Sequence, residues 1–194
     1  MPTDDDLADA LIAARIGEEH GFAILWRALH PAVLRYLRVV AGDAAEDAAS
    51  ETWLQVARDL DRFTGDPAAF RGWLFRIARN RGLDELRRAG RCREDPAETV
   101  DAGPPGRDAA TEALEGAGTA WAVSRIAALP PDQAEAVMLR VVAGLDVAAT
   151  AQVLGKRRGA VRIATMRGLR RLAADPQVRD RTAQGPRHAA AEEV

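Results

Sequence analysis

The feature that most constrains the fold is a long helical pattern from Asp66 to Arg91, apolar at its start and increasingly basic toward its end. At about 100° per residue, side chains at steps of three or four share one face of such a helix. That face carries Trp73, Arg76, Asn80, Asp84, Arg87 and Arg91. Phe70, Leu74 and Ile77 form a neighbouring apolar stripe, which predicts that the helix packs onto a core and leaves its polar face to a partner.

The polar face has the chemistry of a surface that binds a polyanion. An asparagine offers paired donor and acceptor groups to a base edge, and an arginine offers a rigid fork to phosphates. The alternative interpretation is the solvated face of an ordinary amphipathic helix. This stretch by itself is equally compatible with both interpretations, so the rest of the chain has to separate them.

Composition favours an all-α fold, and the linker and motifs described below divide it into two small helical domains. The 194 residues suffice for one large or two small domains, and β-branched and aromatic residues other than valine are sparse. A net charge of -2 does not suggest a nucleic-acid binder, but the charge is segregated along the chain. Residues 156–171 hold seven basic side chains and no acid, whereas acids gather near the N-terminus, in 94–115 and at the end.

Several sites and locations are disfavoured by the sequence. The single cysteine, Cys92, excludes an internal disulfide and a Cys-rich zinc site, and His20 and His30 have no metal-ligand partners at useful spacing. The first residues are acidic, and no apolar run approaches about 18 residues, so neither a signal peptide nor a membrane span is supported. We therefore expect a cytoplasmic protein with no metal, no cofactor and no membrane insertion.

Apolar spacing predicts three further helices before the opening pattern, at residues 7–16, 18–40 and 44–60. Pro31 is expected to kink the second helix or divide it at His30. In the third helix, polar residues at steps of four form an edge. The alternative interpretation of this edge is an ordinary solvated helix face. This edge consists of Asp47, Glu51 and Gln55, and the residues expected to face the core are Trp53, Leu54, Val56, Ala57 and Leu60.

Two segments lack the composition of a folded core. Residues 92–118 contain Pro104-Pro105-Gly106, dispersed acids and few large apolar residues, which predicts a flexible acidic linker, with a short helix around 109–114. Residues 175–194 are expected to be a disordered tail whose arginines could add charge contacts to nucleic acid. The folded parts are thus predicted to be domains at 1–91 and 119–174.

The second domain has the pattern of a helix-turn-helix. A helix is predicted from Pro130-Pro131-Asp132 through Val142, with the aspartate as N-cap and Gly144 as the stop. Asp146 is then expected to cap a short helix over 147–154, and Gly155 permits the turn into a longer basic helix over 158–173. In this motif the second helix enters the major groove.

These two stretches resemble one known family. Residues 40–88 look like region 2, and residues 129–172 like region 4, of the extracytoplasmic-function (ECF) group of bacterial sigma factors in the sigma-70 family. A lone helix-turn-helix is common, but both regions in this order, joined by an acidic linker, are specific to the group. The resemblance implies a non-enzymatic subunit that binds core RNA polymerase and recruits it to promoter DNA.

The resemblance also implies roles for individual residues. The edge Asp47, Glu51 and Gln55 matches the part that docks on the coiled coil of the largest polymerase subunit. Asn80 matches a position that holds a base flipped from the melted −10 strand, and the 63–67 loop forms the pocket wall. The full set expected at the −10 element is Phe63, Thr64, Asp66, Arg76, Arg79, Asn80, Asp84, Arg87 and Arg88.

At the −35 element the resemblance implies duplex recognition by the start of the basic helix, through Lys156, Arg157, Arg158, Arg162 and Arg167. Relatives usually have a Ser or Thr cap in the turn and a Ser-Arg pair after the position of Arg162. This chain has Ile163-Ala164 there, so the relatives' promoter sequence cannot be carried over. Apolar candidates for the polymerase flap tip are Leu139, Val142 and Leu169.

Two further hypotheses concern partners. The family is commonly held inactive by an anti-sigma factor, so a partner of this kind is expected. The alternative function is a stand-alone helix-turn-helix regulator that binds operator DNA without polymerase and uses residues 7–91 as a dimerisation or ligand module. An enzyme is disfavoured, because the sequence shows no catalytic cluster, phosphate loop or nucleophile elbow.

Overall fold

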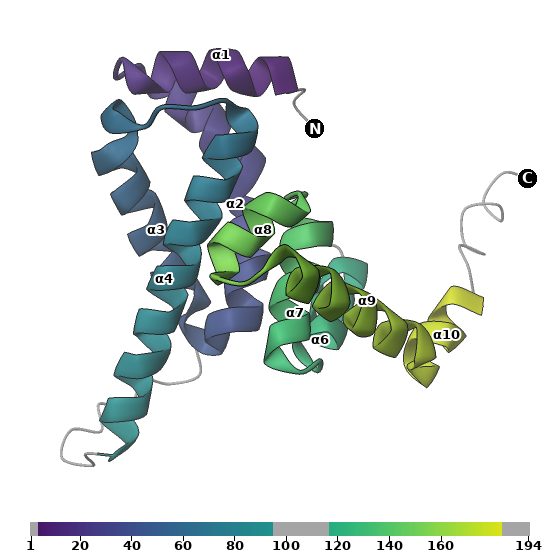
Figure 1. Cartoon of the computed structure of the whole chain (residues 1–194). Coiled ribbons are helices and arrows are strands. Elements are labelled where there is room, and N and C mark those ends of the chain that lie inside the picture. Colours follow the sequence, from purple (N-terminus) through teal and green to yellow (C-terminus); the bar gives the residue numbers. More distant parts are fainter. Residues whose placement is uncertain (1–3, 95–116, 184–194) are drawn as a thin grey trace, which may run out of the picture.

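The computed structural model describes residues 4–94 and 117–183, and within these ranges the regular structure is helical, without a strand. The N-terminal unit consists of α1 (Asp4–Arg15), α2 (Glu19–Ala41), α3 (Ala45–Asp59) and α4 (Pro67–Glu94). Single 3-10 turns, Gly42–Ala44 and Leu60–Arg62, flank α3. In Figure 1, α1 lies across one end of the other three helices. The all-α prediction is confirmed.

The core of the N-terminal unit comes from the apolar faces of its helices. Leu34 and Leu37 of α2, Val56 of α3 and Leu74 of α4 are each at most 1% exposed. Helix α1 crosses α2 at Gly21, where a Cβ atom would lie 2.6 Å from the carbonyl oxygen of Ala10. A side chain of any other residue would therefore hold the two helices apart.

Pro31 does not divide α2, which runs without a break from Glu19 to Ala41. A proline inside a helix removes one backbone hydrogen bond, but the flanking residues Leu29, Val33 and Leu34 are buried in the core. We infer that this packing compensates for the missing bond.

The C-terminal unit consists of α6 (Ala117–Ala127), α7 (Pro131–Val137), α8 (Val147–Leu154), α9 (Arg158–Ala174) and α10 (Pro176–Ala183). A π-helical turn, Met138–Val142, continues α7 as far as the predicted end. The prediction that Asp132 caps α7 was wrong: the N-cap is Pro130, and Asp132 lies in the first turn. With Pro130 as the N-cap, the helix begins two residues earlier than it would with Asp132 as the cap.

Helix α10 was not predicted, because a tail without fixed structure was expected from residue 175 onward. Its sequence is poor in apolar residues, and its contacts are polar and non-local. Arg125 of α6 hydrogen-bonds to Gln177 at 2.9 Å and forms an ion pair with Asp175 at 3.5 Å. The guanidinium of Arg181 lies 4.6 Å from the ring centre of Trp121, also on α6.

The two units pack against each other. Helix α8 lies against α4, and α6 and α7 lie against α2, so the buried residues of both units form one connected apolar cluster (Figure 1). The expected linker helix at 109–114 and most of the predicted linker lie outside the described residues.

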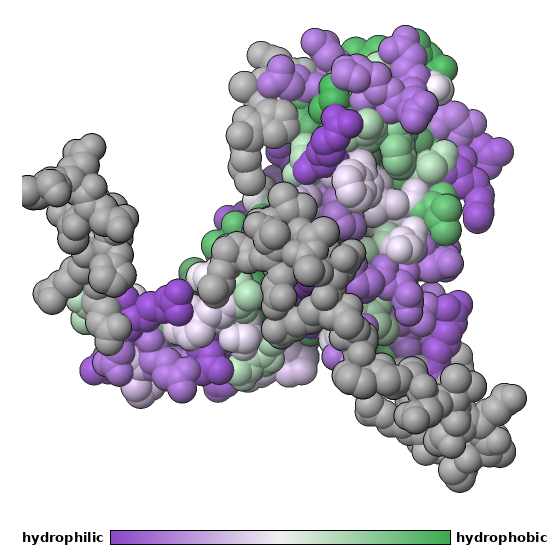
Figure 2. All heavy atoms as spheres, turned by 180° about the vertical axis from the view of Figure 1, so that it is seen from behind, coloured by the Kyte–Doolittle hydropathy of each residue, from purple (hydrophilic) through white to green (hydrophobic). Residues whose placement is uncertain are grey.

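Figure 2 shows the face opposite to that of Figure 1, on which hydrophilic residues alternate with smaller apolar patches where the described residues are visible. In the described ranges, no helix combines the length and the apolar character that a bilayer crossing requires.

Candidate nucleic-acid interface

Helix α4 is oriented by its apolar stripe, as predicted. Phe70, Leu74 and Ile77 are buried, while Arg76 and Asn80 on the other face are exposed. The helix begins with a capping contact, because the backbone N–H of Ala69 donates to Oδ1 of Asp66 at 2.7 Å. Asp66 is therefore a helix cap, although its side chain is also at the predicted −10 surface.

An aromatic cluster lies at the start of α4. The ring of Trp73 is 5.1 Å from that of Phe63 and 5.8 Å from that of Phe70, centre to centre. Trp73 is half-buried, so this residue of the predicted polar face also packs against the core. The loop residue Phe63 is fixed by this stacking.

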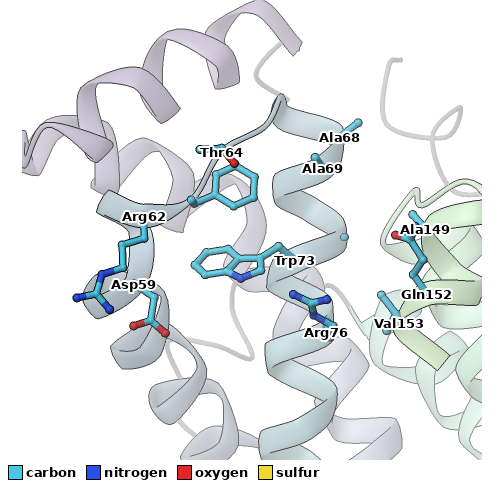
Figure 3. A pocket seen from close by; sticks show the side chains of 12 residues that line it. Asp59, Arg62, Thr64, Ala68, Ala69, Trp73, Arg76, Ala149, Gln152 and Val153 are labelled. Carbon is cyan, nitrogen blue, oxygen red and sulfur yellow. The ribbon is translucent and has the colours of Figure 1, made fainter. Parts of the chain in front are cut away.

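The aromatic cluster forms one wall of a cavity of about 460 Å³ (Figure 3). Phe63, Thr64 and Arg76 line it on the side of the N-terminal unit, and Figure 3 shows residues of α8 on the opposite side. Its volume is in the range typical of small-ligand sites. Two predicted −10 elements, the 63–67 loop and α4, thus contribute to one concave site, whose far wall was not predicted.

The basic residues farther along α4 differ in their availability. Asp84 accepts a hydrogen bond from Arg87 at 2.8 Å, and Arg88 forms an ion pair with Glu85 one turn earlier. Both arginines remain mostly exposed, with side chains 66% and 58% accessible. Exposed pairs of this kind contribute little stability, so DNA could displace them.

Arg79 faces the C-terminal unit instead of solvent. Its Nε donates to Oε2 of Glu135 at 2.7 Å, and the hydroxyl of Tyr36 donates to the same oxygen at 3.1 Å. Burial by itself lowers the pKa of Arg79, but the hydrogen bond and charge of Glu135 outweigh it and raise that pKa. Burial, and then the charge of Glu135, raise the pKa of Tyr36 well above its ordinary value. Both donors therefore keep their protons.

The polar edge of α3 is only partly free. Asp47 and Glu51 are exposed, but Gln55 is half-buried and accepts two hydrogen bonds from Arg81, at 2.9 and 3.1 Å. The prediction that Leu54 and Ala57 face the core was wrong, because both are exposed and Leu54 is 58% accessible. Trp53, Val56 and Leu60 fill the buried side of α3. Leu54 and Ala57 therefore lie on the side that faces solvent.

The helix-turn-helix has the predicted local geometry. Oδ1 of Asp146 accepts from the backbone N–H of Ala149 at 2.6 Å and caps α8. Gly155 follows α8 with a φ of 64°, a left-handed conformation that favours glycine. The predicted −35 residues of α9 and its N-cap, namely Arg157, Arg158, Arg162 and Arg167, are all exposed.

Lys156 differs from these arginines. Its Nζ forms an ion pair with Oδ1 of Asp132 at 2.6 Å, and its side chain is 31% exposed. The pair connects the turn before α9 with the first turn of α7. Asp132 could not be recognised as the partner of Lys156 from the local sequence, because the two residues lie in different segments.

An apolar groove of about 480 Å³ lies beside α9. Met166 and Leu169 of α9 line it together with Arg140 and Val147 from the preceding segments. Leu169 is 44% exposed and Met166 43% exposed. The prediction that Leu139 contributes to such a surface was wrong, because this residue is completely buried in the core. Met166 was missed, although it lies three residues before Leu169 on the same helix face.

Among the described residues, no group of three or more His, Cys, Asp or Glu side chains is placed to hold a metal ion. The candidate site contains guanidiniums, an amide and aromatic rings.

Family models match both units. The model for Sigma-70 region 2 matches residues 25–92, and the model for Sigma-70, region 4 matches residues 120–172. Among curated proteins, the ECF RNA polymerase sigma factor SigD of Mycobacterium tuberculosis is 32% identical over 185 residues, which cover 89% of this chain and 85% of SigD. ShbA of Streptomyces griseus, another ECF sigma factor, is 36% identical over 75% of this chain and 82% of its own length.

The ECF sigma factor BldN of Streptomyces coelicolor is 36% identical over 82% of this chain, and the match spans 62% of BldN. Two solved structures share the fold. CnrH, in complex with the cytosolic domain of CnrY, has a TM-score of 0.60 at 24% identity, covering 87% of this chain and 96% of CnrH. RpoE from Bartonella quintana, in complex with the anti-sigma factor NepR, has a TM-score of 0.58 at 22% identity, covering 78% and 93%.

Proposed function

The chain belongs to the ECF RNA polymerase sigma factors, and we propose that it binds core polymerase and directs it to promoters through a −10 surface on α4 and a −35 surface on α9. The observation that carries this proposal is the presence of two exposed basic surfaces on separate units of one chain. In this role the protein has no catalytic activity of its own and acts in the cytoplasm beside polymerase.

The α3 edge is the proposed contact with the coiled coil of the largest polymerase subunit. Asp47 and Glu51 present carboxylates to a basic partner, and the exposed Leu54 adds an apolar contact on the same helix. Gln55 contributes mainly by accepting hydrogen bonds from Arg81, which hold that arginine next to the edge. An apolar side chain ringed by charges is typical of an interface core with a polar rim.

The −10 element is proposed to be read as a single strand. Asn80 is exposed on α4, and the cavity beside Phe63 and Trp73 offers aromatic faces for stacking an extruded base. Extrusion costs a few kcal/mol of lost stacking, which hydrogen bonds to the base edge and aromatic packing must recover. Arg76, at the rim of the cavity, would neutralise a neighbouring phosphate.

The −35 element is proposed to be read as duplex by α9. Its first two turns present Arg158 and Arg162 to solvent, and the dipole at the start of the helix also attracts phosphate. The groove at Met166 and Leu169 lies on the same helix and suits an apolar peptide, for which we propose the polymerase flap tip.

A regulatory partner is also proposed. An anti-sigma factor, the class of protein bound in the RpoE–NepR structure, would inhibit this chain by covering its binding surfaces. Recovery of a non-polymerase partner in a pull-down from the source cells would support this proposal. Recovery of polymerase subunits alone under all growth conditions would contradict it.

The alternative, a stand-alone regulator, is distinguished by DNA binding without polymerase. Purified chain should bind core enzyme at low salt, and the holoenzyme should shift promoter DNA. A tight, sequence-specific gel shift by the chain alone, together with no binding to core, would favour the stand-alone regulator. Mapping transcript start sites after overproduction of the chain would identify both promoter elements for this test.

A further inference from the structure

The groove beside α9 combines an apolar surface with a positive charge. Met166 and Leu169 line it and are exposed. Within the described part of the chain, its charged lining residues are all arginines, namely Arg140, Arg162 and Arg170. An apolar surface flanked by guanidiniums suits a segment that carries carboxylates next to small apolar side chains.

Helix α10 determines where the C-terminal segment, residues 184–194, leaves the folded unit. The helix follows α9 after a single residue, Asp175, and packs against it. Asp175 and Gln177 contact Arg125 of α6, and Arg181 lies over a tryptophan ring of the same helix. These contacts hold α10, so the C-terminal segment starts from a fixed point.

The C-terminal segment has the chemistry that the groove lacks. Its sequence is QGPRHAAAEEV, in which three alanines precede Glu192 and Glu193 and a valine follows them. The two neighbouring carboxylates can each pair with a guanidinium, and charge-assisted hydrogen bonds of this kind are stronger than neutral ones. The alanines and the valine can lie on the apolar surface between the arginines.

The C-terminal segment is also long enough to reach the groove. The path from Ala183 back along α10 and α9 to Met166 is at most about 30 Å, from the helical rise and an extended turn at Asp175. Residues 184–193 span about 33 Å when extended. The straight line is shorter than the path, so the acidic end can lie beside Met166 and the arginines one turn before and after it.

A segment in this groove would compete with DNA. Arg162 lines the groove and also belongs to the surface proposed to bind the −35 duplex. A carboxylate paired with this guanidinium occupies the position that a backbone phosphate would take. The groove itself is the proposed site for the flap tip, so the segment would compete with both partners.

We propose that residues 184–194 occupy the groove beside α9 in the chain without polymerase, with Glu192 and Glu193 paired to its arginines. The C-terminal segment then acts as an internal competitor of duplex DNA, and the flap tip displaces it when the chain joins polymerase. This consequence rests on the proposed function of α9, whereas the occupancy of the groove does not.

The occupancy is tested in the full-length chain by NMR of methyl-labelled methionines. The chain has three methionines, of which Met166 lies in the groove and Met138 is completely buried in the core. Cys92→Ser removes the native thiol, and Ala190→Cys carries a nitroxide spin label in the C-terminal segment. The label should broaden the Met166 signal, and an unchanged chemical shift of Met138 reports that the unit remains folded.

Charge variants of the labelled chain separate docking from mere proximity. The combined Glu192→Gln and Glu193→Gln variant keeps the tether and the label but removes both carboxylates, so it should restore most of the Met166 intensity. Arg187→Gln is the matched control in the same segment, because a cation is not expected to bind the arginines of the groove. It should leave the Met166 signal broadened.

The competition with DNA is measured by fluorescence anisotropy of a labelled duplex of mixed sequence at low salt. Without the spin label, the combined Glu192→Gln and Glu193→Gln variant should bind this duplex about five times more tightly than the parent chain. The control is Glu18→Gln with Glu19→Gln, which removes the same charge from two exposed residues at the start of α2. This control should change the affinity by less than about twofold.

Three results would overturn the proposal. The first is a sharp Met166 signal in the labelled parent, or one that stays broadened without Glu192 and Glu193. The second is broadening that increases with protein concentration, which would place the segment of a second copy in the groove. The third is equal duplex affinity for the two glutamine pairs. The NMR readout involves neither DNA nor polymerase, so failure of the proposed sigma function would instead appear as loss of core binding in a chain with normal Met166 broadening.

Discussion

Lys156 Nζ lies 2.6 Å from Oδ1 of Asp132, so the turn that leads into α9 is attached to the first turn of α7. The arginines that follow in the sequence have no such attachment to α7, and their side chains extend into solvent. The basic cluster 156–171 therefore contains residues with different tasks. Lys156 contacts α7, and we expect the exposed arginines to be the residues that meet DNA.

Replacing Arg162 with Ala should weaken binding of the holoenzyme to a duplex −35 fragment by about 1 kcal/mol and reduce its salt dependence if the contact is to phosphate. Lys156→Ala is the comparison. The charge of Lys156 is already paired with Asp132, so this substitution should cost less affinity. Fluorescence anisotropy at several salt concentrations measures both. A larger loss for Lys156→Ala than for Arg162→Ala would contradict this division of tasks.

Replacing Asn80 with Ala should impair promoter opening more than it impairs binding to core polymerase. The side chain is exposed on α4, whereas the edge proposed to bind the core belongs to α3. Permanganate reactivity of unpaired thymines reports opening, and co-purification reports core binding. Normal reactivity in a variant that binds core with the parent's affinity would refute the role of Asn80.

Gly168→Ala should destabilise the C-terminal unit by roughly 1–3 kcal/mol through overpacking. The new Cβ would lie 2.7 Å from Cγ2 of Val137 and 3.3 Å from the backbone oxygen of Gln133, and neither atom can move easily. Gly159→Ala on the same helix is the matched control. Its Cβ meets nothing within 4 Å, so this change should stabilise α9 by roughly 0.5–1 kcal/mol.

Urea unfolding of both glycine variants tests this packing. The midpoint should fall for Gly168→Ala and rise or hold for Gly159→Ala. Equal midpoints would mean that α7 and α9 do not cross as closely as the structure shows.

The stability of the fold should decrease as the pH falls below the ordinary imidazole pKa of 6.5, partly because of His30. The ring stacks on Trp26 at 4.6 Å, and burial lowers its pKa, although the charge of Glu46 opposes the shift. In this window the unfolded chain binds the proton more readily than the folded chain, so protonation favours unfolding. The effect is absent above this window, where both states are neutral at this position.

His30→Gln should therefore flatten the dependence of the melting temperature on pH between the ordinary imidazole pKa and more acidic values. His20→Gln, which alters an exposed imidazole of the same helix, isolates the contribution of the half-buried His30 ring. An unchanged slope in His30→Gln would show that another group causes the loss of stability in acid.

Features encoded in short stretches of sequence could be predicted. The apolar stripe of α4, the cap at Asp146 and the turn at Gly155 each depend on a few neighbouring residues, and the structure has them as expected. The same holds for the exposed arginines of α9. In each case local periodicity or backbone preference determines the outcome.

Features that depend on distant residues could not be predicted. Nothing near Arg79 indicates that Glu135, 56 residues later, takes its guanidinium, and nothing near Pro176 indicates that Arg125 and Trp121 hold α10. The exposure of Leu54 and the burial of Leu139 likewise depend on how the helices pack. An apolar residue next to a buried one can face either the core or solvent, and the sequence around it does not decide which.

The central claim is that two surfaces of this chain act together on one promoter through polymerase. The most direct measurement is transcription in vitro from a promoter identified by start-site mapping, with core polymerase and purified chain. We predict transcripts from the mapped start only when the chain is added, and their loss with either Asn80→Ala or a combined Arg158→Ala and Arg162→Ala variant. Specific DNA binding by the chain without any chain-dependent transcript would contradict the account.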